Sequence, residues 1–323
     1  MNAKTIEVSN FAKNLNDFLA QKRALGYLYE DAFYKLNNFA KFVNDRHSDI
    51  TVLTKEIALD WCIKQDNENT KTVSGRVILM REFAKYLISI GEEAFIIPTE
   101  LLPKTLVKPT HIYKMDELKL FWEEADKIPN IDEQFNNLVF PAVFRMLYCC
   151  GLRPIEPLKL RVEDIDFNNG TVEILESKGH KSRTISLPDD LCEYLKNYHK
   201  QIRKSLPNRI AFFPNKKGEH HNYWYLWGLF KKIRSNLEVF NESREKPQLY
   251  DFRHSFATHR LYLWMSEGKD LNVMLPYLST YMGHADLPST YYYIHFVPGL
   301  FENLAGAKFM ENQNLLPEVM LYE

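Results

Sequence analysis

Residues 151–187 read GLRPIEPLKLRVEDIDFNNGTVEILESKGHKSRTISL, and the spacing of apolar residues changes along this stretch. Before it, apolar residues recur at helical spacing, whereas three segments inside it are rich in β-prone residues. Turn-forming residues separate these segments, which are 162–167, 171–175 and 183–187. The stretch therefore predicts a small three-stranded antiparallel sheet with Lys178 at a hairpin tip.

Helices are expected on both sides of this sheet. Helical spacing marks residues 115–125 and 135–150 before it, and helices are expected again from Asp189 to the end of the chain. Gly151 suits the C-terminal end of a helix, and Pro154 suits the first turn of the next.

The first hundred residues predict a bundle of four or so helices without a catalytic constellation. Apolar residues recur at helical spacing from Phe11 to Leu19 and from Phe33 to Phe42, and the pattern continues through 57–63 and 73–88. Thr54 and Thr70 are the expected N-caps.

A proline-containing stretch follows the predicted bundle. Pro98, Pro103 and Pro109 resist helix and predict an extended linker. We place the boundary near residue 106, which gives a helical domain 1–106 and a second domain 107–323. The expected fold class is mainly α (α+β).

Bulk properties narrow the class of protein. At 323 residues, 45% of them hydrophobic and 26% charged, the chain is long enough for two globular domains. It has no long apolar run and no signal-peptide pattern, so we expect a cytoplasmic protein without a membrane partner. The four cysteines, which lack metal-ligand spacing, predict no structural metal site: Cys62, Cys149, Cys150 and Cys192.

The net charge does not indicate a nucleic-acid binder. It is −1 at pH 7, with a pI near 6.8. Binding needs a basic surface rather than a basic total, however, and basic residues gather within 178–183, 203–209 and 216–234. Such clusters are also typical of ordinary solvated faces.

Three basic residues of the second half suit phosphate chemistry. An arginine fork can bond two phosphate oxygens and stays charged, which fits Arg153 and Arg253. Lys178 could donate a proton from its hairpin to a leaving oxygen. Taken singly, each residue also fits an ordinary surface or helix position.

A histidine and a tyrosine complete the candidate set. His284 follows a glycine, and Tyr293 stands nine residues after it. A tyrosine hydroxyl has a pKa near 10, so it needs a neighbouring base and a positive field to attack phosphorus. Tyr291 and Tyr292 precede Tyr293 and are alternative nucleophiles.

Four segments together resemble the catalytic domain of tyrosine recombinases, the phage integrase family. They are residues 151–156, 177–181, 250–254 and 283–293, and the resemblance covers most of residues 110–300. It implies that Arg153 and Arg253 hold the scissile phosphate and that Lys178 is the general acid. It further implies that His284 assists, Tyr293 attacks and Glu156 supports the arrangement.

Two positions depart from the family pattern. Met282 replaces the leucine that usually precedes Gly-His, a small apolar change. Tyr250 stands where the family usually has a histidine. A phenol can donate one hydrogen bond to a phosphate oxygen but cannot become a cation, so we expect the pH dependence and the rate to differ from the family pattern, but not the reaction class.

The resemblance implies a site-specific recombinase or integrase that closes around double-stranded DNA. Tyr293 would form a 3′-phosphotyrosyl link, and a 5′-hydroxyl of a second duplex would reverse the step without metal, ATP or another cofactor. The family acts as a tetramer on two DNA sites. Because its substrate is DNA, the expected setting is the bacterial nucleoid in the cytoplasm. The apolar tail, residues 301–321, could pack on its own domain or on a neighbouring protomer.

Three other functions would use the same fold or similar catalytic residues. A type IB topoisomerase would share the chemistry but rejoin the original strand. A non-catalytic DNA-binding protein could keep the fold, and Tyr250 gives that alternative some support. An enzyme transferring phosphoryl groups between small molecules is a weaker alternative, because no nucleotide-binding glycine loop is present.

Overall fold

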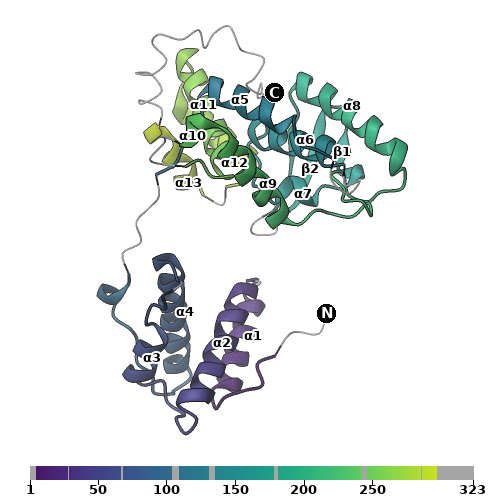
Figure 1. The fold of residues 1–323 in the computed structure, drawn as a ribbon. Coiled ribbons are helices and arrows are strands. Elements are labelled where there is room, and N and C mark those ends of the chain that lie inside the picture. The colour runs from purple at the N-terminus through teal and green to yellow at the C-terminus, as the bar shows by residue number, and fades with distance from the viewer. Residues whose placement is uncertain are drawn as a thin grey trace. The chain divides into compact units, whose positions relative to one another are not determined.

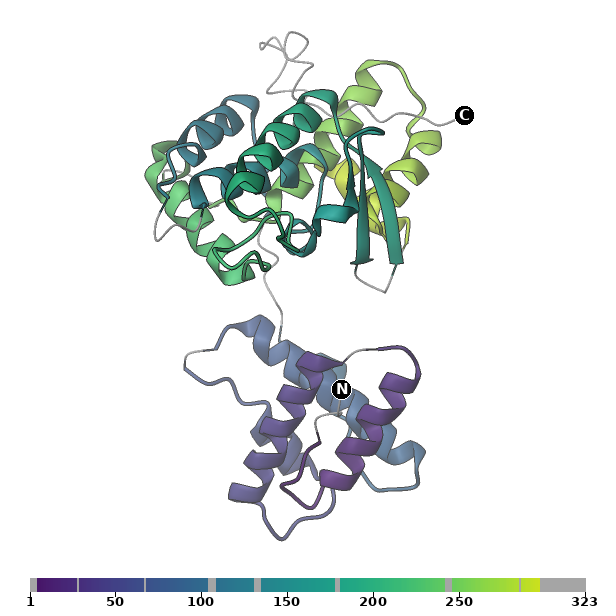
Figure 2. The same cartoon turned by 90° about the vertical axis from the view of Figure 1, so that its right-hand side faces the viewer.

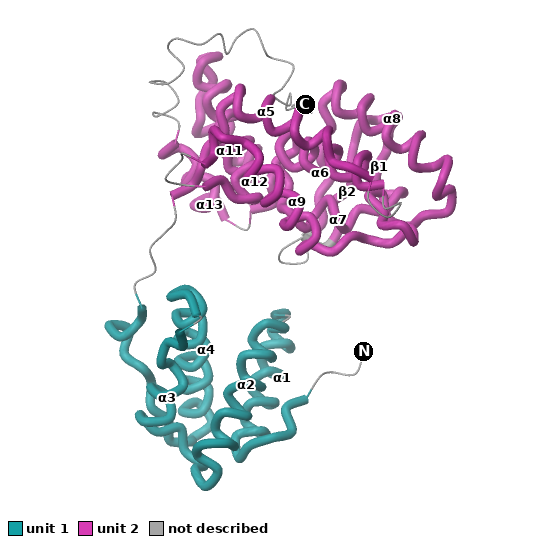
Figure 3. The backbone as a smooth tube through the Cα atoms, viewed as in Figure 1, with its two compact units in different colours: residues 1–107 teal, residues 108–323 magenta. Residues whose placement is uncertain are grey.

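The chain divides into two compact units, Met1–Val107 and Lys108–Glu323, coloured separately in Figure 3. The computed structural model describes residues 5–27, 29–66, 68–103, 109–130, 135–177, 181–241, 246–284 and 286–296. Lys178 and the tail 301–321 lie outside the described residues, as does the predicted boundary near residue 106. Each unit is described by itself.

Unit 1 is a bundle of helices around an aromatic core. Its elements are α1 (Ala12–Ala24), α2 (Glu30–Arg46), α3 (Lys55–Trp61), α4 (Thr70–Ser89) and the 3₁₀ helix η1 (Thr99–Leu101). Phe11, Phe18, Phe39 and Phe83 are almost fully buried and contact one another edge-on or tilted. The predicted helical faces of the first hundred residues therefore form the core.

The helix ends of unit 1 correct two details of the prediction. Thr54 caps α3 as expected, because its side chain accepts a hydrogen bond from the Ile57 amide. Asn69, rather than Thr70, caps α4 and accepts from the Thr72 amide at 2.8 Å. The proline-containing stretch is not extended throughout, since η1 forms one 3₁₀ turn within it.

Unit 2 is mainly helical. Before the sheet come α5 (Met115–Ala125), α6 (Asn136–Cys149) and α7 (Glu156–Lys159), and after it α8 (Asp189–Ser205), α9 (Tyr223–Asn236), α10 (Glu238–Asn241), α11 (Asp251–Ser266), α12 (Leu271–Met282), α13 (Pro288–Tyr291) and the 3₁₀ helix η3 (Tyr292–Phe296). Figure 1 labels most of these elements. The prediction for Pro154 was wrong, because α7 begins at Glu156 and has Pro157 in its first turn.

The predicted sheet is present in the order β1-β2-β3 and is antiparallel. Its strands are β1 (Ile165–Asp166), β2 (Thr171–Ser177) and β3 (Lys181–Ser186). The first strand is shorter than predicted, because residues 162–164 form the 3₁₀ helix η2 (Val162–Asp164). Figure 2 shows β2 and β3 as a hairpin, and β3 contacts α12.

Two glycine turns fix the backbone where the motifs of residues 151–156 and 283–293 meet. Gly151 follows α6 with φ +57° and Gly283 follows α12 with φ +65°, values that favour glycine. A Cβ at Gly151 would lie 2.3 Å from the Phe256 ring, and one at Gly283 would lie 3.1 Å from the Arg183 Cδ. Both turns therefore need glycine for conformation and for space. Within the described part of the chain, no helix is both long and apolar enough to cross a membrane.

Candidate active site

Arg253 joins two of the predicted motifs through their backbones. It lies in the first turn of α11 and is 1% exposed. Its Nη1 donates to the Gly151 carbonyl at 2.7 Å, and its Nη2 donates to the Met282 carbonyl at 2.7 Å. One buried guanidinium therefore ties the turn after α6 to the end of α12. Burial lowers the pKa of Arg253, yet the group keeps its charge at neutral pH.

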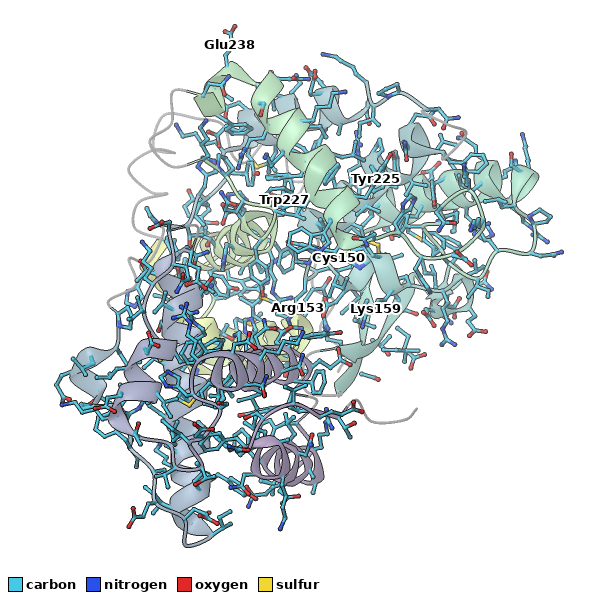
Figure 4. All side chains as sticks on the ribbon, turned by 60° about the horizontal axis from the view of Figure 1, so that its bottom comes forward. Cys150, Arg153, Lys159, Tyr225, Trp227 and Glu238 are labelled. Carbon is cyan, nitrogen blue, oxygen red and sulfur yellow. The ribbon has the colours of Figure 1, made fainter. Side chains whose placement is uncertain are left out.

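Arg153 makes the matching link from the other side. It lies in the turn between α6 and α7, where Figure 4 labels Cys150, Arg153 and Lys159 along the same segment. Its Nη2 donates to the Gly283 carbonyl at 2.6 Å, and its Nη1 donates to Glu156 Oε1 at 2.9 Å. The two arginines thus meet at the Gly283 turn, although they stand a hundred residues apart in the sequence.

Glu156 is a buried carboxylate shared by two arginines. It accepts from the Arg153 amide at 2.8 Å and from both terminal nitrogens of Arg183 at 2.9 Å. Burial opposes ionisation, but the hydrogen bonds and charge of Arg183, together with those of Arg153, leave the pKa of Glu156 below its ordinary value. Glu156 is therefore ionised at neutral pH and orients Arg153.

Tyr293 is the buried member of the tyrosine triplet. It is 3% exposed, whereas Tyr291 is 43% and Tyr292 is 40% exposed. Burial raises the pKa of Tyr293 to about 12, although the charge of Arg253 opposes the rise. The Tyr292 hydroxyl is within hydrogen-bond distance of Thr110 Oγ1, at 2.9 Å. Among the three, only Tyr293 faces the arginine charge in a protected position.

His284 stands against Tyr293. Their rings stack with centroids 5.9 Å apart, and His284 Nδ1 lies 2.7 Å from the hydroxyl of the fully buried Thr290. Burial, reinforced by the charges of Arg253 and Arg153, lowers the pKa of His284 to about 4. The ring is therefore neutral at pH 7, and Thr290 holds its orientation.

A second histidine, His254, packs beside the tyrosines. Its ring centroid lies 5.5 Å from that of Tyr293 and 5.1 Å from that of Tyr250. Burial and the charge of Arg253 lower its pKa to about 4. Tyr250 itself precedes α11 and is 40% exposed, so it lies at the edge of this cluster.

The structure thus brings together five of the residues selected from the sequence, namely Arg153, Glu156, Arg253, His284 and Tyr293, with Tyr250 at the rim. Lys178 lies outside the described residues, but the strands that lead to it pair at Ser177 and Lys181. Sequence reasoning placed Arg183 only among basic surface residues. A signal existed: Arg183 lies two residues before Ile185 and four before Leu187, so the alternation of a strand places it on the same face as these buried residues.

The arrangement suits the binding of an anion and its attack by an oxygen nucleophile. Two guanidiniums, partly or fully removed from water, favour a bound phosphate and the charge that develops on it. No cluster of metal-ligating side chains occurs among the described residues. Arginine guanidiniums can stabilise the charge of a bound phosphate, and a tyrosine hydroxyl can serve as an oxygen nucleophile.

Comparisons with known proteins agree with this chemistry. The sequence model described as the phage integrase family matches residues 116–298. A protein of Sinorhizobium fredii (strain NBRC 101917 / NGR234), named as a candidate integrase/recombinase, y4rB, is 25% identical over 303 residues, which cover 91% of this chain and 96% of the relative. The tyrosine recombinase XerD of Staphylococcus epidermidis (strain ATCC 35984) is 28% identical over 71% of this chain and 72% of its own length.

A solved structure shares the fold. The XerH site-specific recombinase, bound to a palindromic difH substrate in a post-cleavage complex, superimposes with a TM-score of 0.61. The match has 22% sequence identity and covers 84% of this chain and 77% of the other. The mainly helical architecture with its small antiparallel sheet is therefore the architecture of a known DNA recombinase.

Proposed function

The chain belongs to the phage integrase family, and from that premise we propose that Tyr293 carries out its strand cleavage. The protein is a site-specific DNA recombinase of the tyrosine type. The observation that supports the assignment of residues is the convergence of Arg153, Arg253, His284 and Tyr293 from segments about 140 residues apart.

The proposed reaction is a transesterification. The Tyr293 oxygen attacks a backbone phosphorus, its proton leaves, and the bond to the 5′ oxygen breaks as that oxygen gains a proton. The products are a 3′-phosphotyrosyl link and a free 5′-hydroxyl. The 5′-hydroxyl of another strand then reverses the step, so the energy of the phosphodiester bond is retained and no cofactor is consumed.

Each residue has a stated task in this scheme. Arg153 and Arg253 bind the nonbridging phosphate oxygens, and Glu156 orients Arg153. Lys178 protonates the leaving 5′ oxygen, and Tyr250 donates a hydrogen bond at the rim. Because Tyr293 is protonated and buried without DNA, its deprotonation accompanies binding of the phosphate, whose site is lined by neutral His284.

The proposal extends to assembly and place. Unit 1 serves as a DNA-clamping domain and unit 2 as the catalytic domain. Four protomers act on two specific duplex sites, since exchange between two duplexes requires four strand cleavages. The reaction takes place in the cytoplasm, on the nucleoid, because DNA is the substrate.

The test begins with a pool of nicked duplexes drawn from DNA that flanks the gene. Loss of the short fragment beyond the nick traps the covalent intermediate, so duplexes that carry the site remain attached to protein after denaturation. Two captured sites placed on one plasmid then yield inverted or deleted products. Relaxation of a supercoiled plasmid without a site, and without any rearranged product, would instead favour a topoisomerase.

A further inference from the structure

We propose that Arg183 is a positioning residue for strand cleavage, and that it acts by holding Glu156 so that Glu156 keeps Arg153 in its orientation. The proposal rests on the function proposed above. Arg183 lies on β3, in the hairpin that carries Lys178, and its side chain is 9% exposed. Through Arg183, strand β3 contacts Glu156 and, by way of Glu156, Arg153.

All three nitrogens of the Arg183 guanidinium are engaged within the protein. Nε donates to the Tyr281 carbonyl at 2.8 Å, and Nη1 and Nη2 donate to the two oxygens of Glu156 at 2.9 Å each. A planar fork satisfies this set, whereas an ammonium group cannot. Arg183 therefore supports the site from behind and does not itself contact the phosphate.

These contacts close a ring of four segments. Arg183 links β3 to Glu156 at the start of α7, and Glu156 fixes Arg153. Arg153 donates to the Gly283 carbonyl. Two residues earlier in the chain, the Tyr281 carbonyl accepts from Arg183, which closes the ring. His284 directly follows Gly283. Displacing Arg183 therefore loosens the turn that places His284 as well as the carboxylate that places Arg153.

Charge gives the second reason. Arg153 and Glu156 alone would be a neutral pair, which attracts a phosphate weakly. With Arg183 the three groups carry a net charge of about +1, to which Arg253 adds another, as arginines stay ionised in proteins. The transition state gains negative charge, so this surplus favours it more than the bound substrate.

The packing around Gly283 fits the same account. A Cβ at Gly283 would lie 3.1 Å from the Cδ and 3.1 Å from the Nη1 of Arg183. The guanidinium therefore fills the space that a side chain at 283 would need. Arg183 therefore contacts this turn by packing against Gly283 as well as by its hydrogen bond to the Tyr281 carbonyl.

The experiment measures single-turnover cleavage of a captured, nicked duplex at saturating protein, with DNA affinity and thermal unfolding measured separately. Arg183→Gln should slow cleavage by about 10- to 100-fold and change DNA affinity little, because the loss falls on the transition state. Arg183→Lys should recover part of the rate, since it restores charge without the fork. If Arg183→Gln fails to fold, Arg183→Lys carries the same test with a smaller loss.

A double-mutant comparison tests the route through Glu156. In a Glu156→Gln protein, adding Arg183→Gln should slow cleavage less than it does in the wild type, because the positive charge of Arg183 is lost but its hold on the Glu156 carboxylate is already gone. A duplex with sulfur in place of the leaving 5′ oxygen needs no proton donor. The Arg183→Gln defect should persist on it, which separates an effect on Arg153 from an effect on Lys178.

Arg145→Gln is the matched control, because it also removes an arginine that is paired with a carboxylate. Both terminal nitrogens of Arg145 donate to Asp126, at 2.8 and 2.7 Å, and neither residue belongs to the candidate active site. Arg145→Gln should leave the cleavage rate unchanged. Wild-type rates for both Arg183 variants, full additivity with Glu156→Gln, or rescue by the sulfur duplex would each overturn the proposal. Absence of any wild-type adduct would instead count against the proposed function itself.

Discussion

The two units bury different kinds of side chain. Among the described residues of unit 1, Arg76 is the one charged residue that is buried, and the rest of the core is aliphatic and aromatic. Unit 2 buries charged and titratable groups in number: Glu117, Glu156, Asp164, Arg209, His221, Asp251, Arg253, His259 and Arg260. The two cores therefore differ in chemistry.

The buried charged groups of unit 2 depart from the usual composition of a protein core, and several of them belong to the candidate active site. Burying a charge costs free energy unless hydrogen bonds and partners replace water. In unit 2 the carbonyls of Gly151, Met282 and Gly283 replace water around two arginines. Unit 1 needs no such network, because its core is stabilised by apolar burial. Variants in the two units should therefore fail in different ways.

The largest expected effect is on stability, from truncating a core ring in either unit. Phe83→Ala in unit 1 and Phe212→Ala in unit 2 each remove a fully buried ring, which costs about 3–5 kcal/mol. Amide hydrogen exchange, read peptide by peptide, should show the loss of protection confined to the mutated unit. Loss of protection across both units in either variant would break the comparison.

The next effect contrasts one buried arginine from each unit. Arg253→Gln should slow cleavage by about 100- to 1000-fold, because it removes charge next to the reacting phosphate. Arg76→Gln should lower stability but keep the cleavage rate at saturating protein, since Arg76 serves Glu68 and the Ile63 carbonyl in unit 1. Equal rate losses in the two variants would show that burial, rather than position, sets the effect.

Acid should destabilise unit 2 more than unit 1. The pKa values of His254, His259 and His284 are lowered to about 4, chiefly by burial. A depressed folded pKa gives stability that is complete above the unfolded value near 6.5 and is lost as the pH falls toward 4. Asp251 opposes this, because burial raises its pKa to about 6.

Three imidazoles outweigh one carboxyl, so the unfolding free energy of unit 2 should fall by roughly 4 kcal/mol between pH 7 and 5. Unit 1 has a single histidine, His47, which is partly exposed. Denaturant titrations followed by hydrogen exchange measure both units in one sample. An equal fall in the two units, or a rise in unit 2, would contradict the assignment of buried neutral histidines.

The smallest effect belongs to the rim. Tyr250→Phe should slow cleavage by about tenfold, less than Arg253→Gln, because it removes one hydrogen-bond donor from a residue that is 40% exposed, not a buried cation. Tyr250→His should restore the rate and make it rise as the pH falls through about 6.5, where the new imidazole becomes charged. A pH profile of single-turnover cleavage distinguishes these outcomes, and a flat profile for Tyr250→His would show that position 250 does not contact the phosphate.

Much of the fold was readable from the sequence because local patterns determine it. The spacing of Phe33 to Phe42 and the alternation of β2 and β3 each describe one element, so each was predictable. The first strand was overestimated because Val162, Ile165 and Phe167 suit a strand, but residues 162–164 form a 3₁₀ turn in which Asp164 accepts a hydrogen bond from the Arg161 amide. Caps differ by one residue where neighbouring side chains compete, as Asn69 and Thr70 do.

The site was only partly readable, because its geometry depends on contacts between distant segments. Motif order indicated Arg153, Arg253, His284 and Tyr293, but nothing in the local sequence pairs Arg183 with Glu156. Likewise, the sequence could not show which of three consecutive tyrosines lies in the site. The structure distinguishes them, because Tyr293 is buried against His284 whereas Tyr291 is exposed. Long-range pairing is the information that a single sequence lacks.

The most direct measurement is the identity of the tyrosine in the covalent protein–DNA adduct. Wild-type protein and the variants Tyr293→Phe, Tyr292→Phe and Tyr291→Phe are incubated with a captured suicide duplex, and the adducts are resolved after denaturation. We predict an adduct in every protein except Tyr293→Phe, and a tryptic peptide carrying the nucleotide on Tyr293. An adduct that survives in Tyr293→Phe, or that is lost in one of the other two variants, would contradict the account.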